Sequence, residues 1–196
     1  MPVKRYNGTA WEVIAGDGVV GAQGPAGTNG TNGIDAGMTL LSTTSLSGTS
    51  TTISSISQSY NHLQIYIEDW QSSDNGGVGF LRVNSNTTSP NYRYHGILGD
   101  KNGSTSTNGS YGTQIVTGPQ TVTNGDQNNT IVYDIYFYTS AVKKVGNLYS
   151  YYSSDGTVGT VALYQAIFIN ETSAINSITL LSNATQTGTV KIYGVK

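Results

Sequence analysis

The side chains best suited to catalysis in this 196-residue chain are its two histidines, His62 and His95, and the acidic pair Glu68-Asp69. A catalytic or metal-binding imidazole needs a second ligand or a base nearby. The sequence spacing selects no such partner, so we expect both histidines to make structural hydrogen bonds within strands. Adjacent residues of a strand point to opposite faces, so Glu68 and Asp69 cannot flank one glycosidic bond. We therefore expect no enzymatic activity.

Metal and phosphate sites are also weakly supported. The chain has no cysteine, which excludes disulfides and thiolate zinc sites. The segment 124–129 is rich in oxygen ligands but lacks the acidic density of a dedicated calcium loop, so a surface turn is favoured. The glycine-rich segment 76–79 lacks the lysine of a phosphate-binding loop. We expect no metal and no cofactor.

Composition limits the partners. Charged residues make up 10% of the chain and the net charge is −2; polarity comes mostly from 22 Ser, 26 Thr and 17 Asn. Such a chain lacks the clustered Lys and Arg that neutralise phosphates, so no nucleic-acid partner is expected. No apolar run approaches the roughly 20 residues of a membrane span. The first eight residues have no signal-peptide apolar stretch, which predicts synthesis in a cytoplasm without export by the usual route.

Glycine recurs at every third position between residues 18 and 36, at Gly18, Gly21, Gly24, Gly27, Gly30 and Gly33. Three polyproline-II chains wound together place each third residue on a crowded axis where only glycine fits. The spacing therefore predicts a short collagen-like stalk in a homotrimer. A flexible Gly/Asn/Thr linker remains the alternative. Six triplets need trimeric modules on either side to hold them together.

Residues 1–17 form a separate short module. An extended piece from Val3 to Tyr6 and a second from Trp11 to Ile14 flank the turn signal Asn7-Gly8. A lone hairpin is marginal in water. We therefore interpret this module as an anchor on a larger partner, with Arg5, Tyr6 and Trp11 as its candidate contact residues. Self-packing into a small trimeric cap is the alternative.

The sequence pattern of residues 37–196 is typical of an all-β head. Leu63, Ile65 and Ile67 alternate with polar residues, turn signals separate many short apolar runs, and no long 3.6-residue repeat occurs. The pattern predicts an antiparallel β-sandwich, jelly-roll-like. Expected strands lie near 39–46, 50–56, 63–67, 78–84, 92–98, 111–117, 131–137, 142–152, 160–170, 177–182 and 190–192. Segments 100–110 and 120–130 are expected to be loops at an exposed tip.

Two expected strands carry apolar or aromatic residues on both faces. In 130–139 the second face holds Val132, Tyr136 and Tyr138, and in 160–170 it holds Ala162, Tyr164 and Ala166. One face of such a strand would meet water in a monomeric sandwich, so the pattern favours a subunit interface. This agrees with a stalk that needs three chains.

Several segments carry a family resemblance. The opening residues 1–11 resemble the start of many phage fibre and structural proteins. The head resembles a domain widespread in tailed phages, through residues 56–65, 81–84, 91–95, 174–180 and 192–195. The collagen-plus-sandwich layout is also similar to collagen-stalked trimeric heads such as those of the complement and tumour-necrosis-factor-like families, by architecture alone.

The resemblance implies a phage virion protein without a catalytic motif. We expect a homotrimeric fibre on the exterior of the virion, attached to other virion proteins through its N-terminus. A capsid decoration or head fibre protein and a bacterial surface or spore-coat collagen-like filament are the alternatives. Its head is expected to bind a host-surface glycan or protein by shallow contacts multiplied by threefold valency.

Aromatic and amide side chains supply a candidate receptor surface on the head. Tyr and Trp give rigid contact area with a polar handle, and Asn gives adaptable hydrogen bonds. The candidates are Tyr92, Tyr94, Tyr111, Tyr151, Tyr152, Asn108 and Asn128, with Trp70 and Tyr149 beside them.

Overall fold

A computed structural model describes residues 1–15, 37–74, 77–88, 91–100, 103–116, 129–153 and 160–196. The chain divides into two compact units, Met1–Ile34 and Asp35–Lys196, and each is described by itself. The six glycines of the expected stalk lie outside the described residues. Within these ranges the chain is all-β, and none of it forms a helix that could cross a membrane.

The first unit contains an antiparallel hairpin of β1 (Val3–Tyr6) and β2 (Trp11–Ala15), with Tyr6 opposite Trp11. The turn forms where the sequence predicts it. Gly8 has φ +100°, and the Asn7 side-chain oxygen accepts hydrogen bonds from the Thr9 and Ala10 backbone N–H groups at 3.0 and 2.9 Å. This Asn-Gly turn fixes the register of the hairpin.

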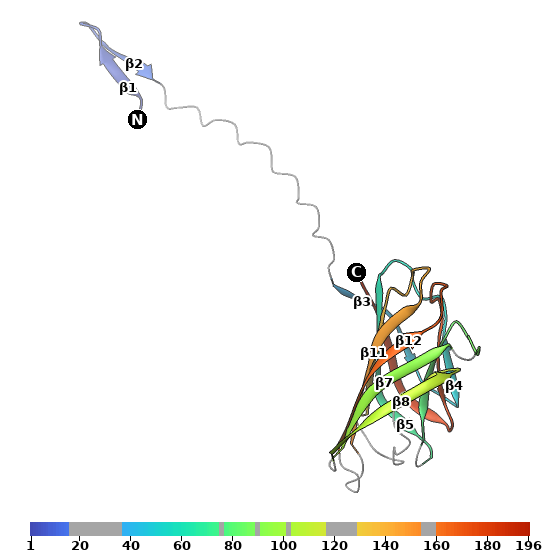
Figure 1. The fold of residues 1–196 in the computed structure, drawn as a ribbon. Helices are drawn as coiled ribbons and strands as arrows, with labels where there is room; N and C mark the ends of the chain where they lie inside the picture. Colours follow the sequence, from blue (N-terminus) through green and yellow to red (C-terminus); the bar gives the residue numbers. More distant parts are fainter. Residues whose placement is uncertain (16–36, 75–76, 89–90, 101–102, 117–128, 154–159) are drawn as a thin grey trace. The chain divides into compact units, whose positions relative to one another are not determined.

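The second unit is built from two antiparallel sheets (Figure 1). The larger has eight strands in the order β3-β14-β5-β10-β11-β12-β7-β8, and the smaller has four in the order β4-β13-β6-β9. The larger sheet comprises β3 (Met38–Ser45), β14 (Gln186–Val195), β5 (His62–Ser72), β10 (Thr130–Tyr136), β11 (Lys144–Ser153), β12 (Thr160–Ile169), β7 (Tyr92–Asp100) and β8 (Gly103–Gly112). The smaller comprises β4 (Ser50–Ile53), β13 (Ile178–Ser182), β6 (Gly79–Val83) and β9 (Ile115–Val116).

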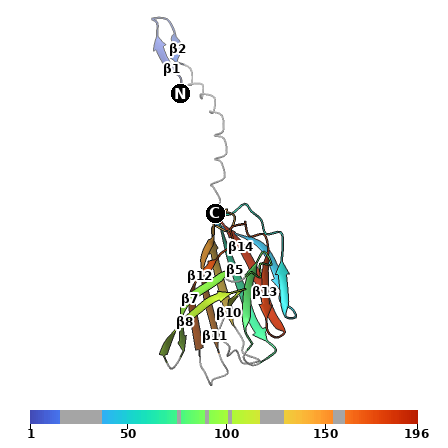
Figure 2. The same cartoon turned by 45° about the vertical axis from the view of Figure 1, so that its right-hand side comes forward.

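One hydrophobic core joins the two sheets. It takes alternate residues from the larger sheet, such as Ile65, Ile135 and Leu148, and packs them with Leu81 and Ile178 of the smaller sheet. All five side chains are fully or almost fully buried. This two-layer arrangement, visible in Figure 2, confirms the expected all-β class and antiparallel sheets.

Both ends of this unit belong to one strand pair. In the antiparallel pairing of β3 with β14, Val195 lies opposite Met38. The chain therefore enters the unit beside the point where it ends. The residues of the expected stalk immediately precede this position in the sequence.

The expectation of an exposed loop at 100–110 is wrong for most of that segment. Residues Gly103–Gly112 form β8, which pairs with β7 through Gly99↔Ser104 and His95↔Asn108. Asn102-Gly103 does mark a turn, since Gly103 has φ +127° and lies opposite Asp100. Asn108-Gly109 does not, because β7 offers a continuous ladder of hydrogen-bond partners that outweighs the local turn preference. Residues 117–128, which include most of the second expected loop, lie outside the described residues.

Candidate functional site on the outer face of the larger sheet

Alternate residues of β5, β10, β11, β12 and β7 point away from the core, and together they form what we call the outer face. The strand registers align these residues in rows across the sheet. The middle row contains Tyr66, Val132, Tyr149, Tyr164 and Ile97. The rows beside it contain Gln64, Asp134, Asn147, Ala166 and His95, then His62, Tyr136, Val145, Phe168 and Arg93. On the other side Glu68, Thr130, Tyr151, Ala162 and Gly99 complete the face.

Large apolar and aromatic side chains on this face are open to solvent in the single chain. The exposed fraction is 57% for Ile97, 50% for Tyr151, 45% for Tyr164 and 44% for Val145. Scattered exposed apolar residues are normal on protein surfaces, whereas contiguous patches mark interaction sites. Ile97, Tyr164 and Tyr151 lie on three neighbouring strands around the small Ala162, so they form one patch, whereas Val145 lies beside Phe168 two rows away.

Ring contacts hold the tyrosines of the outer face in place. The rings of Tyr149 and Tyr164 have centroids 5.1 Å apart, and those of Tyr66 and Tyr193 are 5.7 Å apart and nearly perpendicular. Desolvation and the neighbouring Tyr164 raise the pKa of Tyr149 above its ordinary value. Neutral, mutually oriented phenols give a contact surface that loses little conformational freedom on binding.

Asn147 ties three strands of the outer face together. Its Nδ2 donates to the Tyr136 hydroxyl at 2.9 Å, and its Oδ1 accepts from the Tyr164 hydroxyl at 3.3 Å. In the same row Gln64 Nε2 donates to Asp134 Oδ1 at 2.7 Å. These bonds fix polar groups between the aromatic residues of the face.

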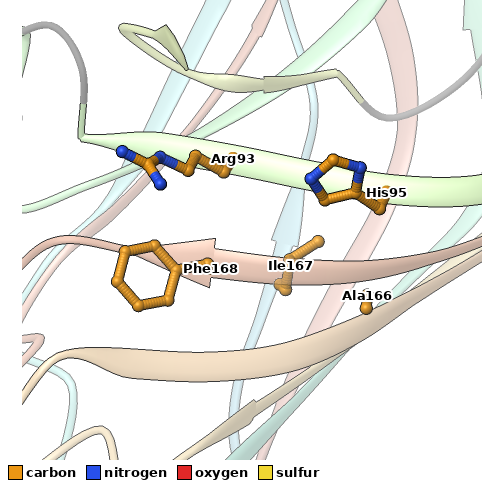
Figure 3. A pocket seen from close by; sticks show the side chains of 5 residues that line it. All are labelled: Arg93, His95, Ala166, Ile167 and Phe168. Carbon is orange, nitrogen blue, oxygen red and sulfur yellow. The ribbon is translucent and has the colours of Figure 1, made fainter. Parts of the chain in front are cut away.

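Two hollows lie on the outer face at Ala166 and Ala162, because the small alanine side chain leaves space there. Arg93, His95, Ala166 and Phe168 line a hollow of about 280 Å³ between β7 and β12 (Figure 3). The Lys143 Nζ lies 5.9 Å from the centre of the Phe168 ring, so the hollow is basic.

The second hollow lies further along the same two strands. Its volume is about 340 Å³, and it is lined by Ile97, Tyr151, Ala162 and Tyr164 among others. It is mainly apolar, in contrast to the basic hollow at Arg93.

The structure corrects three of the surface residues expected from the sequence. Tyr92 is 1% exposed; its hydroxyl accepts a hydrogen bond from the Val83 N–H at 3.0 Å, and burial raises its pKa to about 12. Tyr94 is half-buried against the core. Trp70 is buried and donates its indole N–H to Gln186 at 3.2 Å. All three were selected by residue type. Strand parity turns Tyr92 and Tyr94 toward the interior, and an irregularity at Asp69, which has φ +52°, breaks the alternation of β5 so that Trp70 also points inward.

The other surface candidates divide into two groups. Tyr151 is exposed on the outer face. Tyr111, Tyr152 and Asn108 belong to strands, but their side chains lie outside the described part of the structure, as does all of Asn128.

The two histidines occupy different settings. His62 Nδ1 accepts a hydrogen bond from the Phe137 N–H at 3.3 Å, and its ring packs edge-on against Tyr136 and Phe137. His95 is exposed and lines the basic hollow. Among the described residues no group of three His, Asp or Glu side chains is placed to hold a metal ion.

Ile97, Val145 and Tyr66 belong to the outer face but were not singled out in the sequence. The signal that could have found them is parity: each lies on the same face as Tyr136 or Tyr164 once the strands are aligned. The antiparallel register of five strands is not readable from one sequence, because a shift by one residue moves every side chain to the other face.

The segments that carry the phage resemblance have structural roles here. Asn84 Nδ2 donates to the Ala174 carbonyl at 2.9 Å, and Asn84 Oδ1 accepts from the Asn176 N–H at 2.9 Å. Gln58 Nε2 donates to the carbonyls of Ile56 and Ile175 at 2.8 and 3.0 Å. The bonds of Asn84, and that of Gln58 to Ile175, join segments that are distant in sequence and so help to hold the head together.

The anchor candidates of the first unit lie on its hairpin. The rings of Tyr6 and Trp11 are 5.4 Å apart, and the two side chains are 53% and 67% exposed. Arg5 is exposed and lies opposite Glu12 in the register. An exposed aromatic pair of this kind is suited to insertion into a pocket on a partner.

Comparison of the chain with protein-family models, with curated proteins and with solved structures finds no match.

Proposed function

We propose that this chain is a structural protein of a phage virion that forms a homotrimeric fibre without enzymatic activity. The hairpin of residues 1–17 docks on another virion protein, residues 18–36 wind into a collagen-like stalk, and residues 37–196 form a jelly-roll-like head. The head is presented on the exterior of the particle and contacts the host surface, through a glycan or a protein.

The exposed outer face of the larger sheet is the observation that carries this proposal. A single head leaves a contiguous aromatic and apolar patch in water, with Ile97 and Tyr151 half or more exposed. The same chain holds six Gly-X-Y triplets, which form a stable structure only when three chains wind together. Both features point to an assembly of several copies.

The first unit supports the docking role. Four large apolar or aromatic residues on its strands are more than half exposed: Val3, Tyr6, Trp11 and Val13. A two-stranded hairpin gains little stability alone in water. A binding pocket on a virion protein would cover these residues and order the hairpin at the same time.

The phage assignment is supported by the resemblance of residues 1–11 and of the head motifs. Asn84 and Gln58, which belong to or adjoin these motifs, hold the loops of the head together. A capsid-bound fibre with the same head is the rival placement, and its hairpin would dock on the capsid lattice rather than on the tail.

The placement is tested by electron microscopy of phage particles labelled with antibodies against the full chain. Label on the exterior supports a virion protein, and its position separates tail from capsid. Purified full-length protein should also compete with phage for adsorption to the host. No labelled particle would contradict the virion proposal, and unimpaired adsorption at saturating protein would contradict the receptor role.

A further inference from the structure

We propose that the outer face of the larger sheet is the seam between heads, where a second copy of this chain covers it around a threefold axis. The inference rests on the proposed homotrimer and adds which surface of the head closes it. Strands β7 and β12 contribute one side of the seam, and strands β10 and β5 contribute the other.

The chemistry of the face fits a protein interface. Interface cores are enriched in aromatic residues and depleted of charge. The row Tyr66, Val132, Tyr149, Tyr164 and Ile97 contains no ionisable group other than tyrosine and crosses five strands without interruption. The hollow at Ala162, bounded by Ile97 and Tyr151, has room for a side chain from a neighbouring copy.

The sequence before the head indicates that the occupant is another copy. The last glycine of the triplet repeat is Gly33, and β3 begins at Met38. Chains wound together through Gly33 therefore bring three heads within a few residues of one axis. At that effective concentration, even weak contacts between heads become populated.

The charges on the face favour a head-to-tail contact, which is the kind that closes a threefold ring. Arg93 and His95 lie on β7, at one side of the face. Asp134 lies on β10, toward the other side, and supplies the acidic charge there. Glu68 on β5 is already neutralised by Lys191 at 2.8 Å. Rotation by one-third of a turn brings the basic side of one copy toward the acidic side of the next. This charge complementarity determines which side of one head contacts which side of its neighbour.

A host glycan is the other ligand that a tyrosine-rich face can bind. The exposed apolar side chains of Ile97 and Val145 favour a protein partner instead, because the cores of protein interfaces are apolar. Glycan binding at this face is therefore an outcome of the test below.

Spin labelling of the full chain tests the seam directly. The chain has no cysteine, so Ile97→Cys carries a nitroxide at one defined position. Ser50→Cys is the matched control, since Ser50 is an exposed strand residue of the smaller sheet. The seam predicts an immobilised spectrum at Ile97 and a mobile one at Ser50, in a protein of trimer mass.

A charge substitution gives a second readout. Ile97 is 57% exposed in the single chain, so Ile97→Lys leaves the fold of the head intact. Burial of this lysine in a seam should lower the dissociation temperature of the trimer, whereas Ser50→Lys should leave it unchanged.

The outcomes separate the seam from the proposed function. A trimer with a mobile label at Ile97 would overturn the seam and leave the homotrimer standing. A monomer of full-length protein would overturn the homotrimer and the seam together. A label that is mobile in the trimer and becomes immobile when host-surface polysaccharide is added would assign the face to glycan binding and overturn the seam.

Discussion

The backbone of Gly194 in β14 lies directly against the ring of Tyr60, so closely that a Cβ on Gly194 would come within 2.4 Å of Tyr60 Cγ. This contact couples the last strand of the head to the loop that precedes β5.

We expect Gly194→Ala to destabilise the head by about 1–3 kcal/mol, because the added methyl group must displace the Tyr60 ring from a packed site. Denaturant unfolding measures the loss. Gly37→Ala is the control, since no atom lies within 4 Å of the Cβ position at Gly37. The double variant Tyr60→Ala with Gly194→Ala should lose less than the sum of the single variants; full additivity would contradict the contact.

Lys144 is a buried cation that caps backbone carbonyls. Its Nζ donates to the carbonyl oxygens of Ser140, Val142 and Glu171 at 2.7, 2.5 and 3.2 Å, and burial lowers its pKa below the ordinary value. Lys144→Met should cost about 1–3 kcal/mol of unfolding free energy, because three carbonyls lose their donor. Lys143→Met, at an exposed neighbour, should change stability by less than about 0.5 kcal/mol in the same measurement. Equal effects at the two positions would rule out the capping role.

The ionisation of Glu171 should make the folding stability of the head depend on pH in the acid range. Burial pushes its pKa upward, but hydrogen bonds from the Ser173 N–H and the Asn86 amide, with the Lys144 charge, outweigh burial and hold its pKa below the ordinary 4.5. The folded state therefore gains stability from the ionised carboxylate above pH 4.5 and loses it as pH falls below that value toward the folded pKa.

The variant Glu171→Gln should flatten this part of the stability profile, measured by denaturant unfolding between neutral and acid pH. It should also be less stable than the parent protein at pH 7. If the stability profiles of the parent protein and of Glu171→Gln run parallel through the acid range, Glu171 does not contribute to the acid response.

The glycine register of the stalk makes a separate prediction. Gly27→Ala places a methyl group on the crowded axis of a triple helix and should lower the melting temperature of the stalk, followed by circular dichroism. Thr28→Ala is the matched control, because the next position of the triplet faces outward. The β-sheet signal of the head should be the same in both variants. Equal melting of the two variants would favour a flexible linker at residues 18–36.

The sequence was sufficient to predict the class of fold and most strands, because alternation of apolar and polar residues has a period that is visible locally. The runs around Ile65, Ile135 and Ile192 each predicted a strand that the structure confirms. The hairpin of the first unit was predicted for the same reason, through its Asn7-Gly8 turn.

Sequence reasoning failed where the outcome depends on a partner strand. The composition of the Ser- and Thr-rich segment 103–112 is typical of a loop. The segment nevertheless forms β8, because the backbone of β7 supplies its hydrogen-bond partners. Tyr92 and Tyr94 read as surface residues but point inward, since only the register of β7 with β12 decides which face each residue takes. The outer face was detectable in part, through Tyr136 and Tyr164, while its extent across five strands required the structure.

The mass of the full-length protein in solution tests the central claim most directly. Light scattering at neutral pH should give about 62 kDa, three times the chain mass of 20.7 kDa, across the accessible range of concentrations. A mass of one chain throughout that range would contradict the homotrimeric fibre.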